Sequence, residues 1–579
     1  MKQPFKSFLC LAVTAVAVAV CQPGVADVPG SQPQEQPYLL PVMQTTDIHG
    51  YLVQNAAGTV HYRLAYIADK ALDIRGRGEQ YRKERLLLLD GGDVYQGACV
   101  SNLLSGQPLF ATLDAMDYDA VALGNHEFDW DVTTTVDADA TLPDYTSDGT
   151  PQSNLVPIVC ATLYQNGTRS SLTQDYVIVE KEAVNARGEV LPVKVGVIGF
   201  APDFSSSILP GRFSEQGFSI REDYDKVNAL AASLEENGQC DVTVLLVHGA
   251  ASTAADRLGA GTSIDLVLGG HTHQTVNGVT SWGLPYLQGG RYGESYAYAD
   301  LSFGRKEDGT PAFQSVENRQ TPAVDPEKDL HTQSGQNAED LAENILEISD
   351  KTLAAVAPQL NEVIGYIGIG ATTYYIGSGN RNAVISNWMC DILRKIGKAD
   401  VAFVNAGGIR TSLSLGGASR RDVTVGDVYE IFPFGNVVYV YNLTFAELLK
   451  VFEYSMTSGG RGIFSRMTGL VCRYTDYKVL TLEKTDGTVL YEKGKWKEDW
   501  ASRPVTLAVS EYIATSVRTD YYTGLPNPLT AWNETGRLAD KTLVDNENAI
   551  RVLKAEAAAS GGRLWLDNTA HFIYILPQN

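Results

Sequence analysis

Short apolar runs that end in polar residues or glycine recur through the first half of the chain. From Leu39 to about Gly290 they read, in order, LLPVMQTTD, LLLLDGGD, AVALGNHE, KVGVIGF, VTVLLVHG and IDLVLGGHTH. Such continuous runs are typical of strands buried on both faces. Helix-like stretches, for example Arg63 to Ile74 and Tyr224 to Asn237, lie between several of them. The alternation predicts a layered α/β domain whose strand ends carry the functional site.

A second apolar pattern follows a polar stretch. Residues 319–337 contain two prolines and several polar residues, which predicts a boundary, and residues 338–355 have the apolar spacing of a helix. From about Val363 to Leu576 strand patterns such as VAFVNAG and VVYVYNL are mixed with helical ones. The length of 579 residues also indicates more than one domain. We predict two α/β domains with a linker that contains a helix, at 37–318, 359–579 and 319–358, respectively.

The N-terminus has the pattern of an export signal. Two lysines precede an apolar run from Phe8 to Val20, which is shorter than the roughly 20 residues of a membrane span. Small residues then lead to Ala26, so we expect residues 1–26 to be a signal peptide of an exported protein that is periplasmic, secreted or held at the cell surface. A lipid anchor at Cys21 is less favoured, because the bulky Val20 precedes it. No later stretch reaches spanning length, so no transmembrane segment is expected.

Composition narrows the classes of partner. The chain has 46 basic and 68 acidic residues, a net charge of -22, which repels polyanions and argues against duplex nucleic acid. Small phosphorylated substrates remain compatible, because metals or a few cations reverse the field inside one cleft. Five scattered cysteines remain after the signal peptide, without Cys-x-x-Cys spacing. An odd number leaves at least one without an intrachain partner, so cysteine is not the organising chemistry.

Several strand-end motifs carry residues that bind metals. Asp47 and His49 in TTDIHG are two residues apart, so both side chains can leave one face of the strand toward one ion. The later motifs add Asp93, Asn125, His126, Asp129, His248, His271 and His273. Each residue alone is more simply explained as a hydrogen-bonded loop residue. Five such motifs in order make coincidence improbable and favour a metal centre.

These motifs, in this order, resemble those of the calcineurin-like metallophosphatases, and the set with a second domain behind it resembles the secreted 5'-nucleotidase family. The resemblance covers nearly all of the mature chain. It implies a four-layer α/β metallophosphatase sandwich, a linker helix and a second mixed α/β domain that binds substrate. It also implies two divalent metal ions, the first held by Asp47, His49, Asp93 and His273 and the second by Asp93, Asn125, His248 and His271. Oxygen and imidazole donors favour Zn or Mn, with Fe or Co as alternatives.

The chemistry implied is phosphoester hydrolysis. Two neighbouring cations lower the pKa of water and neutralise the phosphate oxygens that it must approach. The resemblance implies that His126 stabilises charge developing on the phosphate and that Asp129 orients His126. The alternative is that Asp129 and Glu127 only cap the helix that follows.

Phosphate binding from the second domain is implied by NAGGIRTSL. Its glycines allow a ligand close to the backbone, and an arginine can form two hydrogen bonds with a phosphate. The resemblance implies that Asn405 and Arg410 contact the substrate phosphate, and that Arg381 is a further phosphate-binding arginine. The alternative for Arg381 is a surface ion pair. Asn382 and Ser386 depart from the family pattern near it. The predicted substrate-binding residues of the motif are Asn405, Gly407, Gly408 and Arg410.

Two aromatic residues complete the implied substrate site. Phe434 of FPFGN and Tyr512 of SEYIA match the rings that stack on a nucleobase, although either ring could simply belong to the core. The family segment that contacts ribose is replaced here by ATSVRTDYY, with Arg518 at the position of the ribose-binding aspartate and Asp520 two residues later. Thr162 also stands where an asparagine is often found. These departures leave the exact substrate open.

The expected function is a secreted dinuclear-metal hydrolase that removes the 5'-phosphate from nucleoside monophosphates, giving nucleoside and phosphate. The alternatives are a 2',3'-cyclic-nucleotide phosphodiesterase with 3'-nucleotidase activity and a nucleotide-sugar (UDP-sugar) hydrolase. A binding protein that keeps the scaffold without turnover is less favoured, because binding alone does not require donors for two cations. The sequence does not determine the base preference or the oligomeric state.

Overall fold

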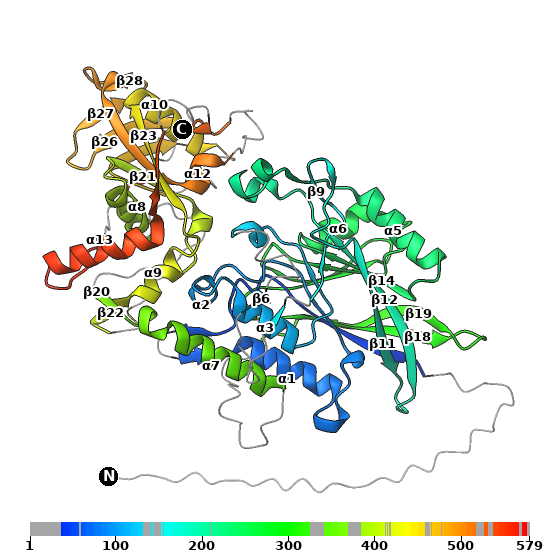
Figure 1. Cartoon of the computed structure of the whole chain (residues 1–579). Helices are drawn as coiled ribbons and strands as arrows, with labels where there is room; N and C mark the ends of the chain where they lie inside the picture. The colour runs from blue at the N-terminus through cyan, green and yellow to red at the C-terminus, as the bar shows by residue number, and fades with distance from the viewer. Residues whose placement is uncertain are drawn as a thin grey trace, which may run out of the picture. The chain divides into compact units, whose positions relative to one another are not determined.

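Strands and helices alternate through the first part of the chain as the apolar pattern predicts (Figure 1). The computed structural model describes residues 36–56, 59–130, 141–142, 152–153, 156–208, 210–324, 341–368, 384–411, 413, 415, 418–457, 464, 466–475, 478–516, 526–530, 537–566 and 570–575. The two example helices are found as α1 (Arg63–Arg75) and α5 (Tyr224–Glu236). The predicted signal peptide, residues 1–26 with Cys21, lies outside the described residues.

A twelve-stranded sheet organises this first part. Its strand order is β16-β17-β15-β14-β12-β11-β1-β4-β5-β8, and β18 pairs with both β1 and β19. Its strands are β1 (Tyr38–Thr45), β4 (Leu87–Asp90), β5 (Ala120–Ala122), β8 (Ile158–Val159), β11 (Tyr176–Val184), β12 (Val190–Phe200), β14 (Val242–Val247), β15 (Leu266–Gly269), β16 (Thr275–Val279), β17 (Pro285–Gly289), β18 (Ala297–Arg305) and β19 (Pro311–Gln320). The register between β1 and β11 contains one pair, Leu39 with Val184, so the two wings of the sheet meet at a narrow junction.

Alternating side chains show that the two wings pack face to face. Leu87 and Leu89 of β4 share one buried cluster with Val195 and Val244 from the other wing. The intervening residue Leu88 faces α1, α3 (Gln107–Ala115) and α7 (Leu341–Leu360) in a second cluster. On the far side, residues of β14 pack against α5 and α6 (Ala251–Leu258). Both faces of each wing are therefore buried, and the arrangement is a helix–sheet–sheet–helix sandwich of four layers.

The second part is also mixed α/β. Its sheets have the orders β20-β22, β24-β21-β29-β23-β30 and β28-β27-β26-β25-β31. Their strands are β20 (Val363–Gly368), β21 (Val401–Val404), β22 (Arg420–Thr424), β23 (Val437–Thr444), β24 (Arg466–Thr468), β25 (Leu470–Thr475), β26 (Lys478–Lys484), β27 (Val489–Glu492), β28 (Lys495–Trp496), β29 (Pro504–Ser510), β30 (Arg537–Val544) and β31 (Phe572–Tyr574). The helices are α8 (Val384–Ile396), α9 (Val425–Ile431), α10 (Phe445–Met456), α12 (Glu511–Thr515) and α13 (Asp545–Ala559). Capping boxes at Thr424 and Thr444 start α9 and α10.

Several short strands and one short helix lie outside the large sheets. The strand pairs β2 (Gln54–Ala56) with β3 (Thr59–His61), β6 (Thr141–Leu142) with β7 (Gln152–Ser153), and the group β9 (Leu163–Gln165), β10 (Thr168–Arg169) and β13 (Phe218–Ile220) lie outside the large sheets. The four-residue helix α2 (Cys99–Asn102) follows β4.

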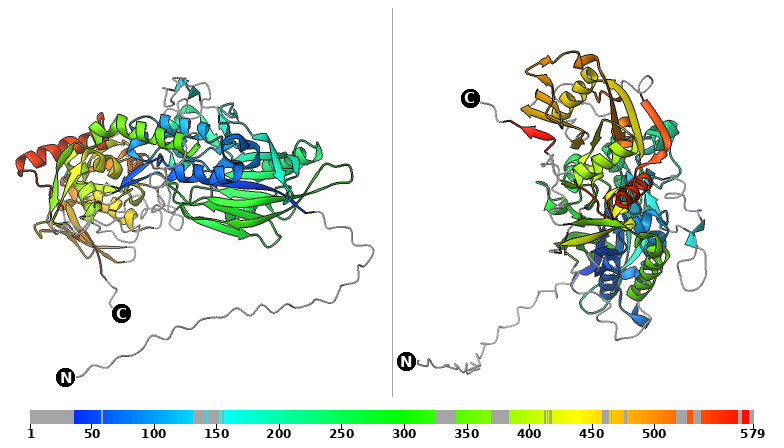
Figure 2. Two further views of the ribbon diagram at one scale, coloured as in Figure 1. Left: turned by 90° about the horizontal axis from the view of Figure 1, so that it is seen from below. Right: turned by 90° about the vertical axis from the view of Figure 1, so that its left-hand side faces the viewer.

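A helix occupies most of the predicted linker. Helix α7 lies beside α1 in both Figure 1 and Figure 2, and it contacts α3 and α9 as well. The hydroxyl group of Tyr62, just before α1, donates a hydrogen bond of 2.7 Å to Asp350 of α7. Near its end, Val356 shares a buried cluster with Cys99 and Tyr429. The helix is thus attached to both parts of the chain, while the domain boundaries at 318/319 and 358/359 stay a prediction.

The sequence also led to expectations for the cysteines and for membrane-spanning segments. The thiols of the five described cysteines are all buried. Among the described residues, no helix combines the length and the apolar character needed to cross a bilayer.

Candidate metal centre and substrate cavity

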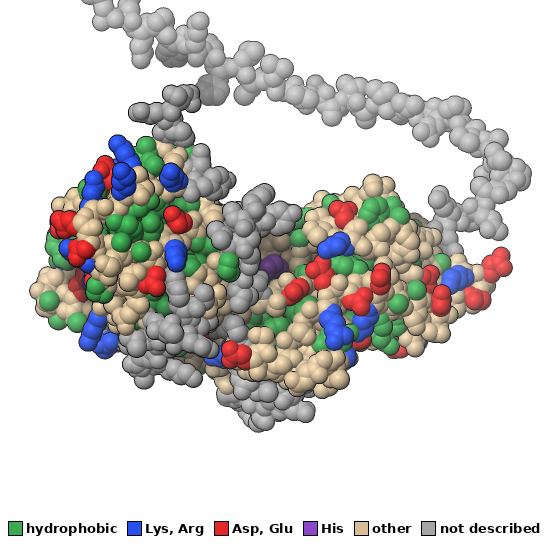
Figure 3. Space-filling model, turned by 90° about the horizontal axis from the view of Figure 1, so that it is seen from above, with side chains coloured by type: hydrophobic (Ala, Val, Ile, Leu, Met, Phe, Trp, Pro, Cys, Tyr) green, Lys and Arg blue, Asp and Glu red, His purple; other side chains and the backbone are tan. Residues whose placement is uncertain are grey.

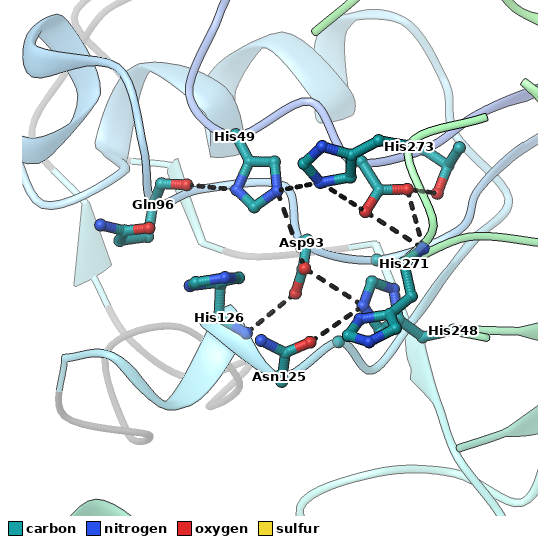
Figure 4. Close-up of polar contacts among 12 residues, drawn as sticks. His49, Asp93, Gln96, Asn125, His126, His248, His271 and His273 are labelled. Carbon is teal, nitrogen blue, oxygen red and sulfur yellow. Dashed lines mark hydrogen bonds and ion pairs between the residues drawn. The ribbon is translucent and has the colours of Figure 1, made fainter. Parts of the chain in front are cut away.

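The predicted metal ligands directly follow the carboxyl ends of buried strands. Strands β1, β4 and β5 are parallel neighbours in one wing, and β14 and β15 are parallel neighbours in the other. Asp47 and His49 follow β1, Asp93 follows β4, Asn125 follows β5, His248 follows β14, and His271 and His273 follow β15. Because the two wings pack face to face, these loops meet at one end of the sandwich (Figure 4). The fold therefore brings together side chains that are up to 226 residues apart, from Asp47 to His273.

The donor atoms gather on two sides of Asp93. On one side, Nε2 of His49 lies 3.1 Å from Nε2 of His273, which lies 3.5 Å from Oδ1 of Asp47. On the other side, Nε2 of His248 lies 3.1 Å from Oδ2 of Asp93, and ligand atoms of Asp93, His248 and His271 fall within 4.8 Å of one another. Oδ2 of Asp93 is also 3.8 Å from Nε2 of His49. Asp93 is thus within reach of both donor groups (Figure 4).

The hydrogen bonds of two histidines indicate that these atoms present lone pairs. Nδ1 of His49 lies 2.9 Å from the carbonyl oxygen of Gln96, and Nδ1 of His248 lies 2.7 Å from that of Gly91. A carbonyl only accepts, so each Nδ1 carries the hydrogen and Nε2 of the neutral ring is a bare acceptor. Nε2 of His248 nevertheless faces Asp93 and, at 3.3 Å, Oδ1 of Asn125. Acceptors that face acceptors repel unless a proton or a metal cation lies between them, and this donor set fits a divalent metal.

Backbone strain is concentrated at the same residues. Positive φ angles, which side-chain-bearing residues rarely adopt, occur at Asp47 (51°), His49 (48°), Asp93 (57°), His271 (69°) and His273 (59°). Such conformations cost roughly 1–3 kcal/mol each and persist where surrounding contacts enforce them. Here the backbone N–H of Asp47 donates to Gly92 and that of His49 donates to Asp93, at 2.9 and 2.8 Å. The strain aims donor groups inward, which indicates a functional site.

Glu127 holds the loops of β4 and β5 together. Its buried carboxylate accepts the backbone N–H groups of Asp93 (3.0 Å), Val94 (2.8 Å) and Gly124 (2.8 Å). Burial, followed by the nearby charge of Asp93, raises the pKa of Glu127 to about 7. A Cβ atom at Gly124 would lie 2.3 Å from Oδ1 of Asp93, so only glycine fits between the two loops. Glu127 therefore ties Asp93 into position and does not cap the short helical turn His126–Phe128.

His126 and Asp129 form the predicted pair. Nδ1 of His126 lies 2.5 Å from Oδ2 of Asp129, and the backbone N–H of His126 donates to Oδ1 of Asp93 at 2.8 Å. Burial lowers the pKa of His126, but the charges of Asp129 and Asp93 outweigh it and leave this pKa raised. The ring thus favours the protonated form, in which Nε2 is a donor. The contact with Asp129 argues against the alternative of a purely helix-capping aspartate.

The pKa values of the ligand histidines differ from that of His126. Burial lowers the pKa of His49 well below its ordinary value, and burial with the charge of Arg410 lowers that of His273 to about 3. Both rings are therefore neutral at physiological pH, as metal ligands must be. Burial also lowers the pKa of His248, but the charge of Asp93 outweighs it and raises this pKa to about 10. A proton at His248 would compete with a metal ion for the same lone pair.

A cavity of about 450 Å³ opens beside this cluster. Figure 3 shows a histidine side chain inside a hollow of the surface. The cavity is lined by Asp93, Asn125, His126, Asp129, Ser207, His271, Thr272, His273, Arg291, Asn405, Gly407, Gly408, Arg410, Phe434, Asn436 and Tyr512. It therefore includes every predicted substrate-binding residue that the structure describes.

Three residues that the sequence singled out lie outside the described residues, and a fourth is described but lies apart from the cavity. Arg381, Arg518 and Asp520 lie outside the described residues. Thr162 is fully buried, and its hydroxyl group is bonded to the backbone of Ala201 at 2.9 and 3.1 Å. Thr162 thus has a structural place apart from the cavity.

Arg410 and Phe434 contact each other, and Phe434 also contacts His126. The guanidinium carbon of Arg410 is 4.9 Å from the centre of the Phe434 ring, and that ring stacks on His126 with centroids 5.7 Å apart. Burial is the largest cause of the lowered pKa of His49, and the charge of Arg410 adds to it; at His126 the same charge only partly opposes the rise in pKa. Arg410 lines the same cavity as Asp93 and His273. Tyr512 is half-buried, lines the same cavity, and packs against the core of the second part.

Several residues of the site were not predicted from the sequence. Arg291, Ser207, Thr272 and Asn436 line the cavity, and Gln96 and Glu127 hold the ligand loops. Arg291 comes two residues after the end of β17. The strand-end rule that found the histidines could have found it as well. Ser207 ends a short 3-10 helix, Ser205–Ser207, and Asn436 lies in an irregular segment; neither carries a comparable signal.

Comparisons with known proteins agree with this geometry. Residues 364–481 match the family model described as 5'-nucleotidase, C-terminal domain. The chain is 24% identical over 505 residues to the 5'-nucleotidase of Vibrio cholerae serotype O1. The alignment covers 81% of this chain and 85% of that protein. It is also 24% identical over 520 residues to the endonuclease YhcR of Bacillus subtilis, which covers 83% of this chain but only 37% of that longer protein. The crystal structure of a 5'-nucleotidase precursor from Thermus thermophilus covers 93% of this chain and 100% of that chain, with a TM-score of 0.64 and 19% identity, a likeness of fold.

Proposed function

We propose that the chain, which is similar to proteins of the 5'-nucleotidase family, is a dinuclear-metal phosphohydrolase that removes the 5'-phosphate from nucleoside monophosphates. The products are a nucleoside and phosphate. The observation that carries the proposal is the set of aspartate and histidine donors on the two sides of Asp93, beside a cavity that contains Arg410 and two aromatic residues. The donors supply the hydrolytic chemistry, while the arginine and rings fit a nucleotide.

The proposed metal ligands fall into two sets. Asp47, His49, Asp93 and His273 hold the first ion, and Asp93, Asn125, His248 and His271 hold the second. We propose Zn or Mn as the metal, with Fe or Co as alternatives, because all donors are oxygen or imidazole nitrogen. When bound, two such ions lower the pKa of water and neutralise the phosphate oxygens. The lone pairs that converge around Asp93 support this assignment.

The protein's own groups then act on the phosphate. Asp129 holds Nδ1 of His126 at 2.5 Å, which fixes the ring and favours its protonated form. Nε2 of His126 donates to a phosphate oxygen and stabilises the charge that develops there. Arg410 and Asn405 bind the same phosphate, with Gly407 and Gly408 allowing its close approach. Arg381, outside the described residues, is proposed as a further phosphate ligand from the family pattern alone.

The aromatic rings are proposed to contact the base. Phe434 and Tyr512 both line the cavity, and stacking on such rings contributes roughly 1–3 kcal/mol per base. One face of Phe434 is already next to His126. Its remaining surface is what a base would meet, so the nucleoside extends away from the metal cluster, with its phosphate directed toward Asp93.

A second candidate substrate is a nucleotide with a second phosphate, such as a nucleotide sugar. The observation that favours it is Arg291, which lines the cavity near His273. Its Nε atom lies 3.7 Å from Glu294, a long contact between side chains that are each 45% exposed. Such an exposed pair contributes little, so the guanidinium group can bind an additional anion.

Export is proposed on the sequence alone. The two N-terminal lysines, the apolar run of residues 8–20 and the small residues before Ala26 support a signal peptide of residues 1–26. We therefore place the mature enzyme in the periplasm, outside the cell or at its surface, acting on external nucleotides.

A phosphate-release assay tests the proposed reaction. AMP, 3'-AMP, 2',3'-cyclic AMP and UDP-glucose are compared with added Mn or Zn, with and without a chelator, and the products are identified by mass spectrometry. We expect AMP to yield adenosine and phosphate, with chelator abolishing the rate. Hydrolysis restricted to 3'-AMP and the cyclic nucleotide, or to UDP-glucose, would replace the proposed substrate. Two bound ions without any hydrolysis would indicate a binding protein.

A further inference from the structure

The loop that carries Phe434 is attached to the loop that orients a metal ligand. The backbone carbonyl oxygen of Pro433, the residue before Phe434, accepts two side-chain amides from the segment after β4. Asn102 donates to it from Nδ2 at 2.5 Å, and Gln96 donates from Nε2 at 3.4 Å. These two bonds join residues that are more than 330 positions apart in the sequence.

Hydrogen bonds to its own turn also hold the side chain of Asn102. Its Oδ1 atom accepts the backbone N–H of Gly97 at 2.9 Å, and its Nδ2 atom donates to the carbonyl oxygen of Gly97 at 3.1 Å. The amide group is therefore held in one orientation by its own turn. Little side-chain freedom is lost when it also binds Pro433, which makes the contact stronger than one from a mobile surface asparagine.

Gln96 connects the same turn to the metal cluster. Its backbone carbonyl accepts Nδ1 of His49 at 2.9 Å, while its side chain, only 1% exposed, points to Pro433. The next residue, Gly97, packs so closely that a Cβ there would lie 2.4 Å from the carbonyl oxygen of His49. The backbone N–H of Ala98 donates to that same oxygen at 2.7 Å. The turn is therefore locked to His49.

The Phe434 ring contacts a second group beside the metal cluster, the ring of His126. It stacks on His126, with ring centroids 5.7 Å apart and an angle of 23° between the planes. One short loop, Pro433–Phe434, thus contacts both the turn that orients His49 and the ring of the proposed acid. The position of Phe434 relative to the metal cluster is set by these contacts.

We propose that Gln96 and Asn102 are positioning residues that hold Phe434 at a fixed distance from the metal centre, so that base recognition and phosphoester hydrolysis act on one nucleotide. The proposal rests on the proposed nucleotidase function. Loss of the two amide donors leaves the metal ligands in place, since His49 is oriented by a backbone carbonyl. It removes only the contacts that fix the distance between the base-binding ring and the metal cluster.

Asn102→Asp removes the donor to Pro433 with the smallest change to the side chain. An aspartate keeps an oxygen for the N–H of Gly97 but has no donor for the carbonyl of Pro433. Gln96→Met, of similar length, removes the second donor and leaves the backbone carbonyl for His49. Asn277→Asp is the matched control, because Nδ2 of Asn277 also donates to a backbone carbonyl, that of Arg319 at 2.8 Å, away from the cavity.

The test compares AMP with ribose 5-phosphate, which has the same phosphate and sugar but no base. For Asn102→Asp we expect KM for AMP to rise about tenfold, the effect of losing one or two hydrogen bonds. Values of kcat/KM for ribose 5-phosphate and bound metal per chain stay within about twofold of the parent. Gln96→Met changes in the same direction by less, and Asn277→Asp behaves as the parent protein.

Two results would overturn the proposal. Equal losses for AMP and ribose 5-phosphate would mean that the turn only supports the fold or the metals, and an unchanged KM for AMP in both variants would mean that the link has no role. If Asn102→Asp does not fold, Gln96→Met decides between these outcomes. A parent protein that binds adenosine but does not hydrolyse AMP would contradict the proposed function separately, and adenosine affinity would then decide the role of the two amides.

Discussion

At the scale of single residues, charge distinguishes the histidines of the cluster. His126 has Asp129 at 2.5 Å and a raised pKa, whereas burial and then the charge of Arg410 lower the pKa of His273 to about 3. The same side chain is therefore suited to proton donation at one position and to metal binding at the other. Burial lowers the pKa of both rings, and the charges of Asp129 and Asp93 together outweigh it at His126.

His126→Ala separates these two roles. We expect the variant to keep its bound metal and to lose AMP turnover by about 10²–10⁴-fold, the usual contribution of a positioned proton donor. Metal analysis and kcat measurements check this, with His61→Ala as a control for loss of an imidazole outside the cluster. Near-normal kcat with bound metal would remove the proposed role of His126.

Arg291→Gln tests the second candidate substrate. Loss of this cation should lower kcat/KM for UDP-glucose or ADP about tenfold, and for AMP by less than about threefold, since only the former carry a second phosphate. Arg257→Gln is the matched control, because Arg257 also pairs with a glutamate, at 3.1 Å, but does not line the cavity. Equal effects on all nucleotides would show that Arg291 does not distinguish them.

At the scale of elements, one buried and one partly buried carboxylate fix the loops and the strand register. Glu127 joins the loops after β4 and β5 through three backbone N–H groups. Asp265, just before β15, accepts the backbone N–H of Thr243 in β14 at 2.8 Å. Both carboxylates satisfy backbone donors that strand pairing does not reach.

Glu127→Ala leaves three N–H groups without this acceptor. We expect the free energy of unfolding to fall by about 2–5 kcal/mol, because each buried unsatisfied donor costs about 1–3 kcal/mol and water restores part of the loss. Urea unfolding at fixed metal concentration measures it. The control Glu222→Ala, which removes an exposed ion pair with Arg257, should change stability by less than about 1 kcal/mol. Similar stability of the two variants would contradict the anchoring role.

Asp265 gives a pH dependence whose sign follows from burial. Burial raises its pKa to about 6, whereas an unfolded aspartate titrates near about 3.9. The folded state thus binds the proton more tightly, so this stabilising contribution is complete below about pH 4 and is lost as pH rises to about 6. Asp265→Asn should therefore be more stable than the parent at pH 7, by at most about 3 kcal/mol, but not at pH 4. Urea unfolding measures both free energies. The same difference between Asp265→Asn and the parent at pH 7 and pH 4 would refute this pH dependence.

At the scale of the whole molecule, much of the fold could be predicted from its apolar pattern. Runs such as LLLLDGGD are buried on both faces because they lie between a helical layer and the second wing, and their polar ends therefore meet at one edge. Asp47, Asp93 and His248 could be predicted as neighbours for this reason. The fold class and the family resemblance are confirmed.

The remaining parts of the site depend on contacts between distant loops. The three acceptor bonds of Glu127 and the link from Asn102 to Pro433 involve residues that have no periodic signal and meet only after folding. The positive φ angles of Asp47 and His273 likewise follow from loop geometry, which a sequence pattern does not encode. The roles of Phe434 and Tyr512 toward a base, and the domain boundaries, stay predictions.

The central claim is that Asp93 is shared by two metal ions. The most direct measurement is the metal content of the full chain after equilibration with Zn or Mn and removal of free ions, compared between the parent and Asp93→Asn. We predict two ions per chain for the parent and at most one for the variant, since its amide lacks the charge needed to bridge two cations. Fewer than two ions in the parent, or two in the variant, would contradict the account.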